Sequence, residues 1–428
     1  MAALRKLWGL RRQRPVFVAT SLAVLAFLVA YPAVHWWLQS QGVLEGFRYF
    51  DLGAYRGAVN SWQAGEPIYV ENDEGGYHGS YLYPPVYLLL FLPVTDAPFA
   101  DLTFHQAGTL LNVVSVGLLW VGLQAAVAGY GLRLAWVERL LMLWAVAGFA
   151  PVIISMQLAQ VSVFLAALLA FALAGIRYGD RHGRRGRLGQ YASGALTAVA
   201  GTLKLIYAPA GAHLLADRRR FAAAVATGLG LLAVSLAVFG LEVHVQYYEV
   251  LTWGKGWGES RAPFPPNLWL PPYYRPFYYL GATLGMAIRV VLAAGISGLA
   301  VLSAGGGVDE ETFALGVAAI PLVAPRAYTQ DLALVLPVVV ALLATELRRE
   351  EGHPVVPVVG LFLAAVHPSG FFGILHLLAA VFPASSYDAL GSLVGLLQPG
   401  VWAALLLVGL AAVRVAEAAT PPARLQGR

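Results

Sequence analysis

The chain has no cysteine among its 428 residues. Disulfides, thiolate nucleophiles and cysteine-ligated metals are therefore excluded. Charged residues are also scarce, at 12%, while hydrophobic residues reach 59%. A typical soluble domain carries about 25% charged residues. So few charges cannot keep a globular surface hydrated, which excludes a cytosolic enzyme, a nucleic-acid-binding protein and a disordered protein.

Lysine is nearly absent, with 3 lysines against 25 arginines. The formal net charge of +5 is spread over short basic runs between long apolar segments. Such runs set the orientation of membrane helices and do not form a nucleic-acid footprint. Nucleic acid is therefore not expected as a partner, whereas membrane lipids are.

Several catalytic motifs are missing, namely HExxH, a P-loop, GxSxG, and GxGxxG in a Rossmann context. We therefore expect no cofactor and no nucleotide site. One acid-x-acid spacing, Glu71 and Asp73, is also found in divalent-metal sites. Its polar, glycine-containing surroundings favour a solvated turn, so we predict no metal here but keep the site as an alternative.

Long apolar segments dominate the rest of the chain, and about twelve are candidate membrane spans. The first, Val16–Leu38, is too long for a cleaved signal peptide. Several others are short and interrupted by proline, and interrupted backbone at membrane depth is tolerated only where it lines a cavity or is buried in protein. We predict an all-α polytopic membrane bundle with an internal site. The spans are Val16–Leu38 and residues 104–127, 139–155, 158–176, 190–203, 205–216, 221–240, 279–303, 311–325, 328–345, 354–367 and 397–414.

The basic residues predict the orientation. If the short apolar segment Pro84–Pro93 dips in and returns, most basic residues fall on the side of the N-terminus, as the positive-inside rule requires. We then expect residues 1–15 to be a cytoplasmic basic N-terminus, 16–416 one membrane domain, and 417–428 a disordered cytoplasmic tail. Two long loops, 39–103 and 242–278, face the extracytoplasmic side.

The first of these loops carries an acid just beyond the first span. Asp51 follows an aromatic run near the hydrocarbon boundary, where partial desolvation raises the pKa of a carboxyl group and makes it a better base. It could equally cap a helix. Residues 51–63 fit an amphipathic interfacial helix. Its apolar face would carry Leu52, Tyr55, Val59 and Trp62.

Cations occur at three later positions. Lys204 stands between two apolar halves that are each too short to span; it either needs an anionic or carbonyl partner or extends to the interface. Loop 242–278 carries Asn267 and Arg275 among aromatic residues, which suits a sugar or a phosphate-bearing lipid, or any interfacial loop. Arg326 lies in a polar hairpin and is a candidate phosphate ligand, with Asp331 as its possible salt-bridge partner.

The order of these features resembles glycosyltransferase family 87. A first span is followed by Asp51 and Tyr55, then by a Gly-x-x-x-Tyr motif at Gly65, then by Tyr-Pro-Pro at Tyr83. The likeness covers most of residues 47–340. It continues with Gln160, Lys204 with Pro209, Asn267, and Pro325 with Tyr328. Ala159 and Ser162 replace residues that are usual in the family, and Gln330 and Asp331 stand where aromatic and histidine residues are common.

This resemblance implies a GT-C fold, with an extracytoplasmic juxtamembrane helical loop. It implies inverting transfer of a sugar, with a mannose-like hexose favoured, from a polyprenyl-phosphate carrier to a lipid or glycan acceptor outside the plasma membrane. Asp51 aligns with the catalytic base. The substrate-binding candidates are Arg326, Lys204, Arg275, Tyr55, Tyr83, Gln160, Asn267, Tyr328 and Asp331. A transporter or flippase of a lipid-linked or anionic substrate is the alternative, since broken helices and a central lysine fit it too.

Overall fold

The computed structural model describes most of the chain. The described residues are 2–42, 46–71, 76–77, 79–95, 101–179, 183–253, 273–274, 276–277, 280–324, 327–367 and 398–419.

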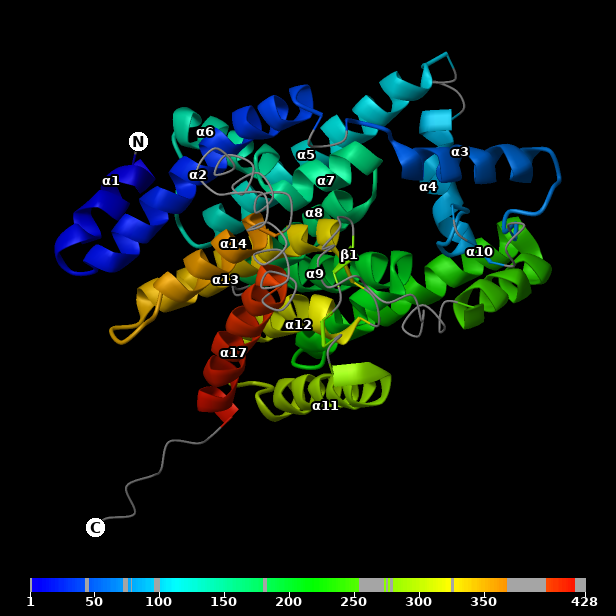
Figure 1. The fold of residues 1–428 in the computed structure, drawn as a ribbon. Helices are drawn as coiled ribbons and strands as arrows, with labels where there is room; N and C mark the ends of the chain where they lie inside the picture. The colour runs from blue at the N-terminus through cyan, green and yellow to red at the C-terminus, as the bar shows by residue number, and fades with distance from the viewer. Residues whose placement is uncertain are drawn as a thin grey trace, which may run out of the picture.

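The described residues form a helical bundle with one short two-stranded sheet (Figure 1). This confirms the all-α prediction. The elements are α1 (Ala2–Gly9), η1 (Leu10–Arg12), α2 (Pro15–Ser40), α3 (Phe50–Gln63), η2 (Pro85–Tyr87), α4 (Leu88–Thr95), α5 (Phe104–Gly129), α6 (Trp136–Ala147), α7 (Ala150–Leu158), α8 (Ser162–Gly179), α9 (Arg184–Leu203), η3 (Leu205–Leu214), α10 (Arg218–Trp253), β1 (Tyr273–Tyr274), α11 (Gly281–Leu302), α12 (Asp309–Val323), β2 (Ala327–Tyr328), η6 (Thr329–Leu334), α13 (Val335–Arg348), α14 (Val355–Ala365) and α17 (Pro399–Ala419).

Among the described residues, seven helices are long and apolar enough to cross a membrane, or eight if α6 and α7 form one bent span. The chain is therefore a multi-pass membrane protein. The predicted count of about twelve is not confirmed. Predicted spans 190–203, 205–216, 311–325 and 354–367 are helical, but η3, α12 and α14 have only 10, 15 and 11 residues, and α9 begins in a run of arginines.

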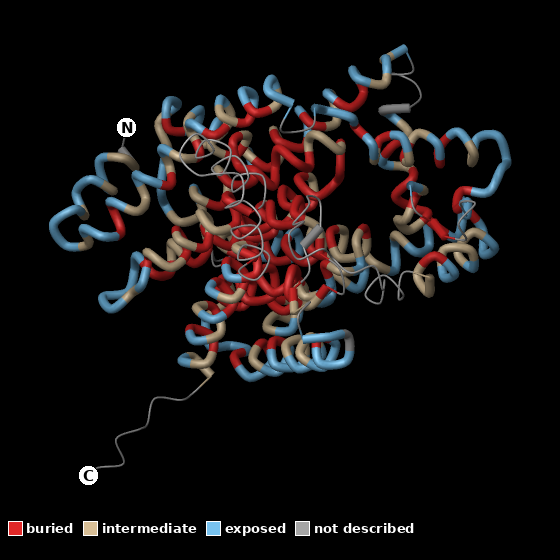
Figure 2. The backbone as a smooth tube through the Cα atoms, in the orientation of Figure 1, coloured by how far each residue is buried: buried red, intermediate tan, exposed pale blue. Residues whose placement is uncertain are grey.

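The core lies where α8 and the η6–α13 segment run through the middle of the bundle (Figure 2). In the 18-residue apolar stretch of each helix, 67% of the residues are buried in α8 and 78% in η6–α13. In α10, only 6% of the residues in such a stretch are buried. A helix that is apolar all round and unburied by protein is suited to face lipid, so α8 and α13 are inner helices and α10 is an outer one.

Two breaks interrupt the helices, one between α6 and α7 and one at Lys204. α6 and α7 meet at 64°, next to Gly148, where a Cβ atom would lie 2.3 Å from the Leu28 carbonyl oxygen. α9 ends at Lys204, whose extended backbone (φ −133°, ψ 98°) separates it from η3. These breaks free backbone and side-chain polar groups inside the bundle.

The segment between the first two spans forms short helices. α3 buries Leu52, Tyr55 and Val59, and Trp62 packs on Phe239 with 5.2 Å between ring centroids. The predicted apolar face is therefore confirmed. η2 and α4 have 3 and 8 residues, too few for the ~20 that a crossing needs. The side of the membrane that this segment faces stays a prediction.

Candidate active site

A buried carboxylate joins three elements inside the bundle. Asp331, in η6, is 1% exposed. Its Oδ1 accepts hydrogen bonds from Lys204 Nζ at 2.6 Å and from the Tyr207 hydroxyl at 2.8 Å. Ser162 Oγ, at the start of α8, lies 2.7 Å from the same oxygen. We expected Asp331 to pair with Arg326, which lies outside the described residues, but the carboxylate is bound to Lys204.

Lys204 is turned into the bundle, with its side chain 12% exposed. Its ammonium lies 5.5 Å from the ring centroids of both Tyr207 and Tyr328. A buried ammonium needs a counter-charge and donors directed at acceptors. The structure supplies the carboxylate of Asp331 and two aromatic faces, so Lys204 has the anionic partner expected from the sequence.

A chain of polar contacts leads from this pair towards α3. Gln160 Oε1 lies 2.6 Å from Ser162 Oγ, and Gln160 Nε2 donates to the Tyr83 hydroxyl at 3.0 Å. The Tyr83 hydroxyl lies 3.4 Å from that of Tyr55. The sharp turn between α7 and α8 that presents Gln160 is made by Ala159, which adopts a left-handed conformation with φ 55°. That backbone favours glycine, the residue usual in the resembling family.

Asp51 lies in the first turn of α3, outside the membrane-spanning helices. Burial raises the pKa of its carboxyl group to about 7; Lys204 acts in the opposite direction, and Asp331 raises the pKa further. The N-cap residue is Tyr49, and no side chain caps the helix, so the capping alternative for Asp51 is wrong. Asp51 is instead a half-buried acid within electrostatic reach of the Lys204–Asp331 pair.

Contacts at the start of α3 fix the position of Asp51. The backbone N–H groups of Arg48 and Tyr49 both donate to the carbonyl oxygen of Gln157, at 3.1 and 2.8 Å. Tyr49 has a left-handed backbone with φ 51°, and its ring fills the space above Gly108, where a Cβ atom would lie 2.5 Å away. These contacts tie α3 to α7 and α5.

Three tyrosines after α3, namely Tyr69, Tyr81 and Tyr87, are buried within the protein. The hydroxyls of Tyr69, Tyr81 and Tyr87 donate to backbone carbonyl oxygens at 2.7, 3.1 and 2.9 Å. Tyr55 is 1% exposed and stacks on Phe91 with centroids 4.0 Å apart. Tyr55 is therefore held in place one helical turn after Asp51.

Sequence reasoning missed Tyr207 and did not name Ser162 as a site residue. Tyr207 lies three residues after Lys204, so one helical turn would bring the two side chains to the same face. Ser162 lies two residues after Gln160 and is the first residue of α8. Neither position carries a signal of its own, because each gains its role from Asp331, which is distant in sequence.

Four predicted residues, Asp73, Asn267, Arg275 and Arg326, lie outside the described residues. The sequence neighbours of Arg275 and Arg326 nevertheless meet in the sheet, because Tyr273 pairs with Tyr328 and Tyr274 with Ala327. The second long loop thus returns to the hairpin beside Lys204. Glu71 is exposed, and within the described ranges no group of three histidine, aspartate or glutamate side chains could hold a metal ion.

The site thus combines a buried acid–cation pair, Asp331 with Lys204, and a second acid, Asp51, whose pKa that pair influences. Residues 81–325 match the model of glycosyltransferase family 87. That segment is more than half of the chain, so the protein belongs to glycosyltransferase family 87 and is a glycosyltransferase. Tyr83, Gln160 and Lys204 lie inside the matched segment, whereas Asp51 precedes it and Asp331 follows it.

Two solved structures resemble the whole chain weakly. One is ArnT from Cupriavidus metallidurans bound to undecaprenyl phosphate, with 16% identity, 96% of this chain and 78% of that chain covered, and a TM-score of 0.34. The other is the apo state of ArnT from the same organism, with 15% identity, coverages of 94% and 78%, and a TM-score of 0.31. Scores this low carry no argument about the site. No curated protein matches the chain significantly in sequence.

Proposed function

We propose that this glycosyltransferase moves a sugar from a polyprenyl-phosphate carrier to a hydroxyl of a lipid or glycan acceptor. The reaction takes place at the extracytoplasmic face of the plasma membrane, and Asp51 is the base. The observation that carries the proposal is an acid in the first turn of α3, Asp51. Burial raises the pKa of its carboxyl group to about 7, while Lys204 and Asp331 act on that pKa in opposite directions. A base is most effective when its pKa lies near the working pH.

The reaction needs few protein groups, because a sugar phosphate is already activated. Asp51 takes the proton of the acceptor hydroxyl, and the acceptor oxygen attacks the anomeric carbon from the face opposite the phosphate. The bond between the anomeric carbon and the phosphate oxygen breaks, and the carrier phosphate leaves with the bonding electrons. One displacement inverts the configuration.

The leaving phosphate gains negative charge and needs cations. The ammonium of Lys204 has three N–H donors, of which one is directed at Asp331, so two can serve a phosphate. Arg275 and Arg326 adjoin the paired residues Tyr274 and Ala327 in sequence. We assign the phosphate to Lys204, Arg275 and Arg326, since fixed cations stabilise a developing oxyanion.

The remaining predicted residues have supporting roles in this proposal. Tyr328 lies against Lys204 and, with Asn267, is assigned to the sugar, for which we favour a mannose-like hexose. Gln160, Tyr83 and Tyr55, whose polar contacts run from the Lys204–Asp331 pair to α3, are assigned to substrate binding. Asp331, one of the predicted substrate-binding residues, contributes in this proposal by orienting Lys204.

The test is Asp51→Asn in the purified, reconstituted enzyme, supplied with a panel of polyprenyl-phosphate sugars. We expect release of carrier phosphate to fall at least about 100-fold, the usual contribution of a general base. Glu66→Gln is the matched control, because Glu66 is an exposed acid just after α3. Transfer near the wild-type rate in Asp51→Asn would remove Asp51 from this role. Substrate flux without a covalent product would indicate a flippase instead.

A further inference from the structure

Arg289 is a charged residue inside an apolar membrane helix. α11 contains the candidate span Thr283–Leu302, and only 17% of the residues in its apolar stretch are buried. Arg289 lies six residues into this span, about 9 Å along the helix at 1.5 Å per residue. Charged side chains at such positions are costly, usually face the bundle or a water-filled cavity, and often mark substrate paths. None of the roles proposed above uses this cation.

Arg289 lies on the side of α11 that faces the bundle. Gly285, Ile296 and Ala300 of the same helix are buried, and Ile296 and Ala300 are 5% and 0% exposed. Arg289 follows Gly285 by four residues and precedes Ile296 by seven, so the four residues share one side of the helix. Arg289 itself is half-buried. Its side chain therefore runs along the protein and is not surrounded by lipid.

The segment before α11 folds back over this side of the helix. A Cβ atom on Gly285 would lie 3.6 Å from the carbonyl oxygen of Phe277, and Arg289 Nη2 donates to the carbonyl oxygen of Pro276 at 3.3 Å. Helical side chains lean towards the N-terminus of their helix, and Pro276 precedes α11. The guanidinium is therefore directed towards the end of the span, where its charge approaches the membrane boundary and the level of lipid phosphates.

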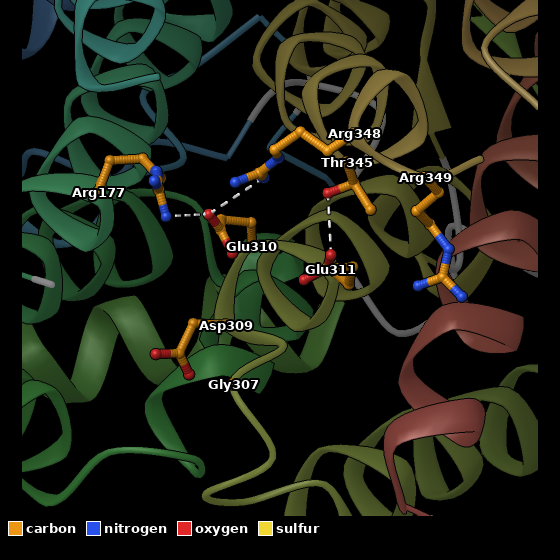
Figure 3. A pocket seen from close by; sticks show the side chains of 8 residues that line it. All are labelled: Arg177, Gly307, Asp309, Glu310, Glu311, Thr345, Arg348 and Arg349. Atoms are coloured by element: carbon orange, nitrogen blue, oxygen red, sulfur yellow. Dashed lines mark hydrogen bonds and ion pairs between the residues drawn. The ribbon is translucent and has the colours of Figure 1, made fainter. Parts of the chain in front are cut away.

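Arg289 has no carboxylate partner among the described residues, and its Nε is buried without a hydrogen-bond partner. Three other largely buried arginines each pair with a carboxylate at 2.5–2.7 Å, namely Arg177 with Glu310, Arg220 with Asp309 and Arg414 with Glu346. Figure 3 shows the first of these pairs, which lines a polar pocket. A partly buried cation is costly without a counter-charge. We therefore expect the anion for Arg289 to come from outside the chain.

A short segment connects Arg289 with the active site. Pro276, which Arg289 contacts, follows β1 by two residues, and two residues span at most about 7 Å. β1 pairs with β2, and the ring of Tyr328 in β2 lies 5.5 Å from Lys204 Nζ. Arg289 is thus close to the hairpin that borders the proposed phosphate site, while most of α11 is open to lipid.

We propose that Arg289 binds the phosphate of the lipid-linked carrier as it moves from the membrane to Lys204. This inference rests on the proposed function. The polyprenyl chain stays in the lipid beside α11, and the phosphodiester carries one negative charge, which a guanidinium matches with two parallel hydrogen bonds. No bond forms or breaks at Arg289. Its loss should therefore affect binding of the donor more than turnover.

The first test measures binding without turnover, using polyprenyl monophosphate, which has no sugar to transfer. The full chain with Lys204→Gln is purified in detergent, so that the inner phosphate site is weakened, and retained carrier is measured by native mass spectrometry. Adding Arg289→Gln or Arg289→Met should weaken retention at least about tenfold, because a charge-assisted hydrogen bond is lost. Adding Arg219→Gln, which removes an exposed arginine at the start of α10, should change nothing.

Two outcomes of this test would overturn the proposal. One is unchanged retention in both neutral variants of Arg289. The other is displacement of the carrier by an equal amount of phosphatidylglycerol, which would indicate a site for any lipid phosphate. Because this test needs no sugar transfer, its result does not depend on whether Asp51 is the base.

The second test measures transfer in the otherwise wild-type chain. With a long-chain donor, Arg289→Gln should lower kcat/KM at least about tenfold and leave kcat within about twofold, since binding and not chemistry is affected. Arg289→Lys, which keeps the charge, should restore most of the loss. A short-chain, water-soluble donor can reach Lys204 without the membrane and should be affected much less. If Arg289 only held the carbonyl oxygen of Pro276, kcat would fall for both donors, and that result would also overturn the proposal.

Discussion

Lys204 Nζ and Asp331 Oδ1 lie 2.6 Å apart, although 127 positions separate the residues in sequence. The ion pair lies where α9 ends. Its lysine lowers the pKa of Asp51, and its aspartate raises it. The lysine is held by a buried carboxylate, yet only one of its three donors is used there. An ammonium fixed in this way can receive a leaving phosphate without reorganisation.

The wild-type pH profile is the first prediction. A base works only when ionised, so kcat/KM should rise with pH and level off above the Asp51 pKa of about 7. An unperturbed aspartate would place this rise, the acidic limb of the pH profile, near pH 4. The measurement is initial rate of carrier-phosphate release between pH 5 and 9, with stability checked at each pH. A profile that is flat across this range would contradict the assignment.

The second prediction is that two substitutions move this limb in opposite directions. Lys204→Gln removes a cation that lowers the pKa of Asp51, so the limb should move to higher pH. Asp331→Asn removes an anion that raises it and frees the charge of Lys204, so the limb should move to lower pH. Each shift should be a fraction of a unit or more, read from kcat/KM. Shifts in the same direction would show that the limb belongs to another group.

Asp51 also affects stability, which is the third prediction. Its folded pKa lies above the value in an unfolded chain, so the fold disfavours the ionised form and loses stability as pH rises from about 4 to about 7. Asp51→Asn should therefore be inactive but have an apparent Tm a few degrees above wild type at pH 8. The gain should shrink towards pH 4. A lower Tm at pH 8 would show that the wild-type carboxylate is stabilising.

The fourth prediction concerns the contact that positions α3. Gly108→Ala would place a Cβ atom 2.5 Å from the ring of Tyr49, two residues before Asp51, and should push the start of α3 outwards. We expect kcat to fall at least about tenfold, because small displacements of a catalytic group are costly. Gly117→Ala on the same helix is the control, since nothing lies within 4 Å there. Equal activities would show that α3 tolerates the shift.

The fifth prediction compares a buried and an exposed ion pair. Arg414 contacts Glu346 at 2.7 Å, and Glu346 is fully buried. Arg414→Leu should destabilise the protein by about 3–5 kcal/mol, because it leaves a buried carboxylate unpaired. Arg349→Leu, which removes an exposed partner of Glu417, should cost about 0–1 kcal/mol. Thermal or denaturant unfolding in detergent measures both, and similar losses would contradict the distinction.

Local patterns in the sequence predicted much of the architecture. The apolar runs indicated a membrane bundle, and the spacing of Leu52, Tyr55 and Val59 indicated the buried face of α3. The short halves on either side of Lys204 indicated a broken helix. Each of these features is set by residues close together in the chain. The span count was less predictable, because short buried helices such as α12 and α14 are as apolar as true spans but are not long enough.

The amino-acid sequence alone determined that this chain is a membrane protein and that an acid, Asp51, follows its first span. Only the tertiary structure decided that Lys204 pairs with Asp331 and that Tyr207 and Ser162 join them. Periodicity and composition report how each segment meets its surroundings. Which distant side chains share a charge or a proton depends on how helices pack, and that is a property of the whole bundle.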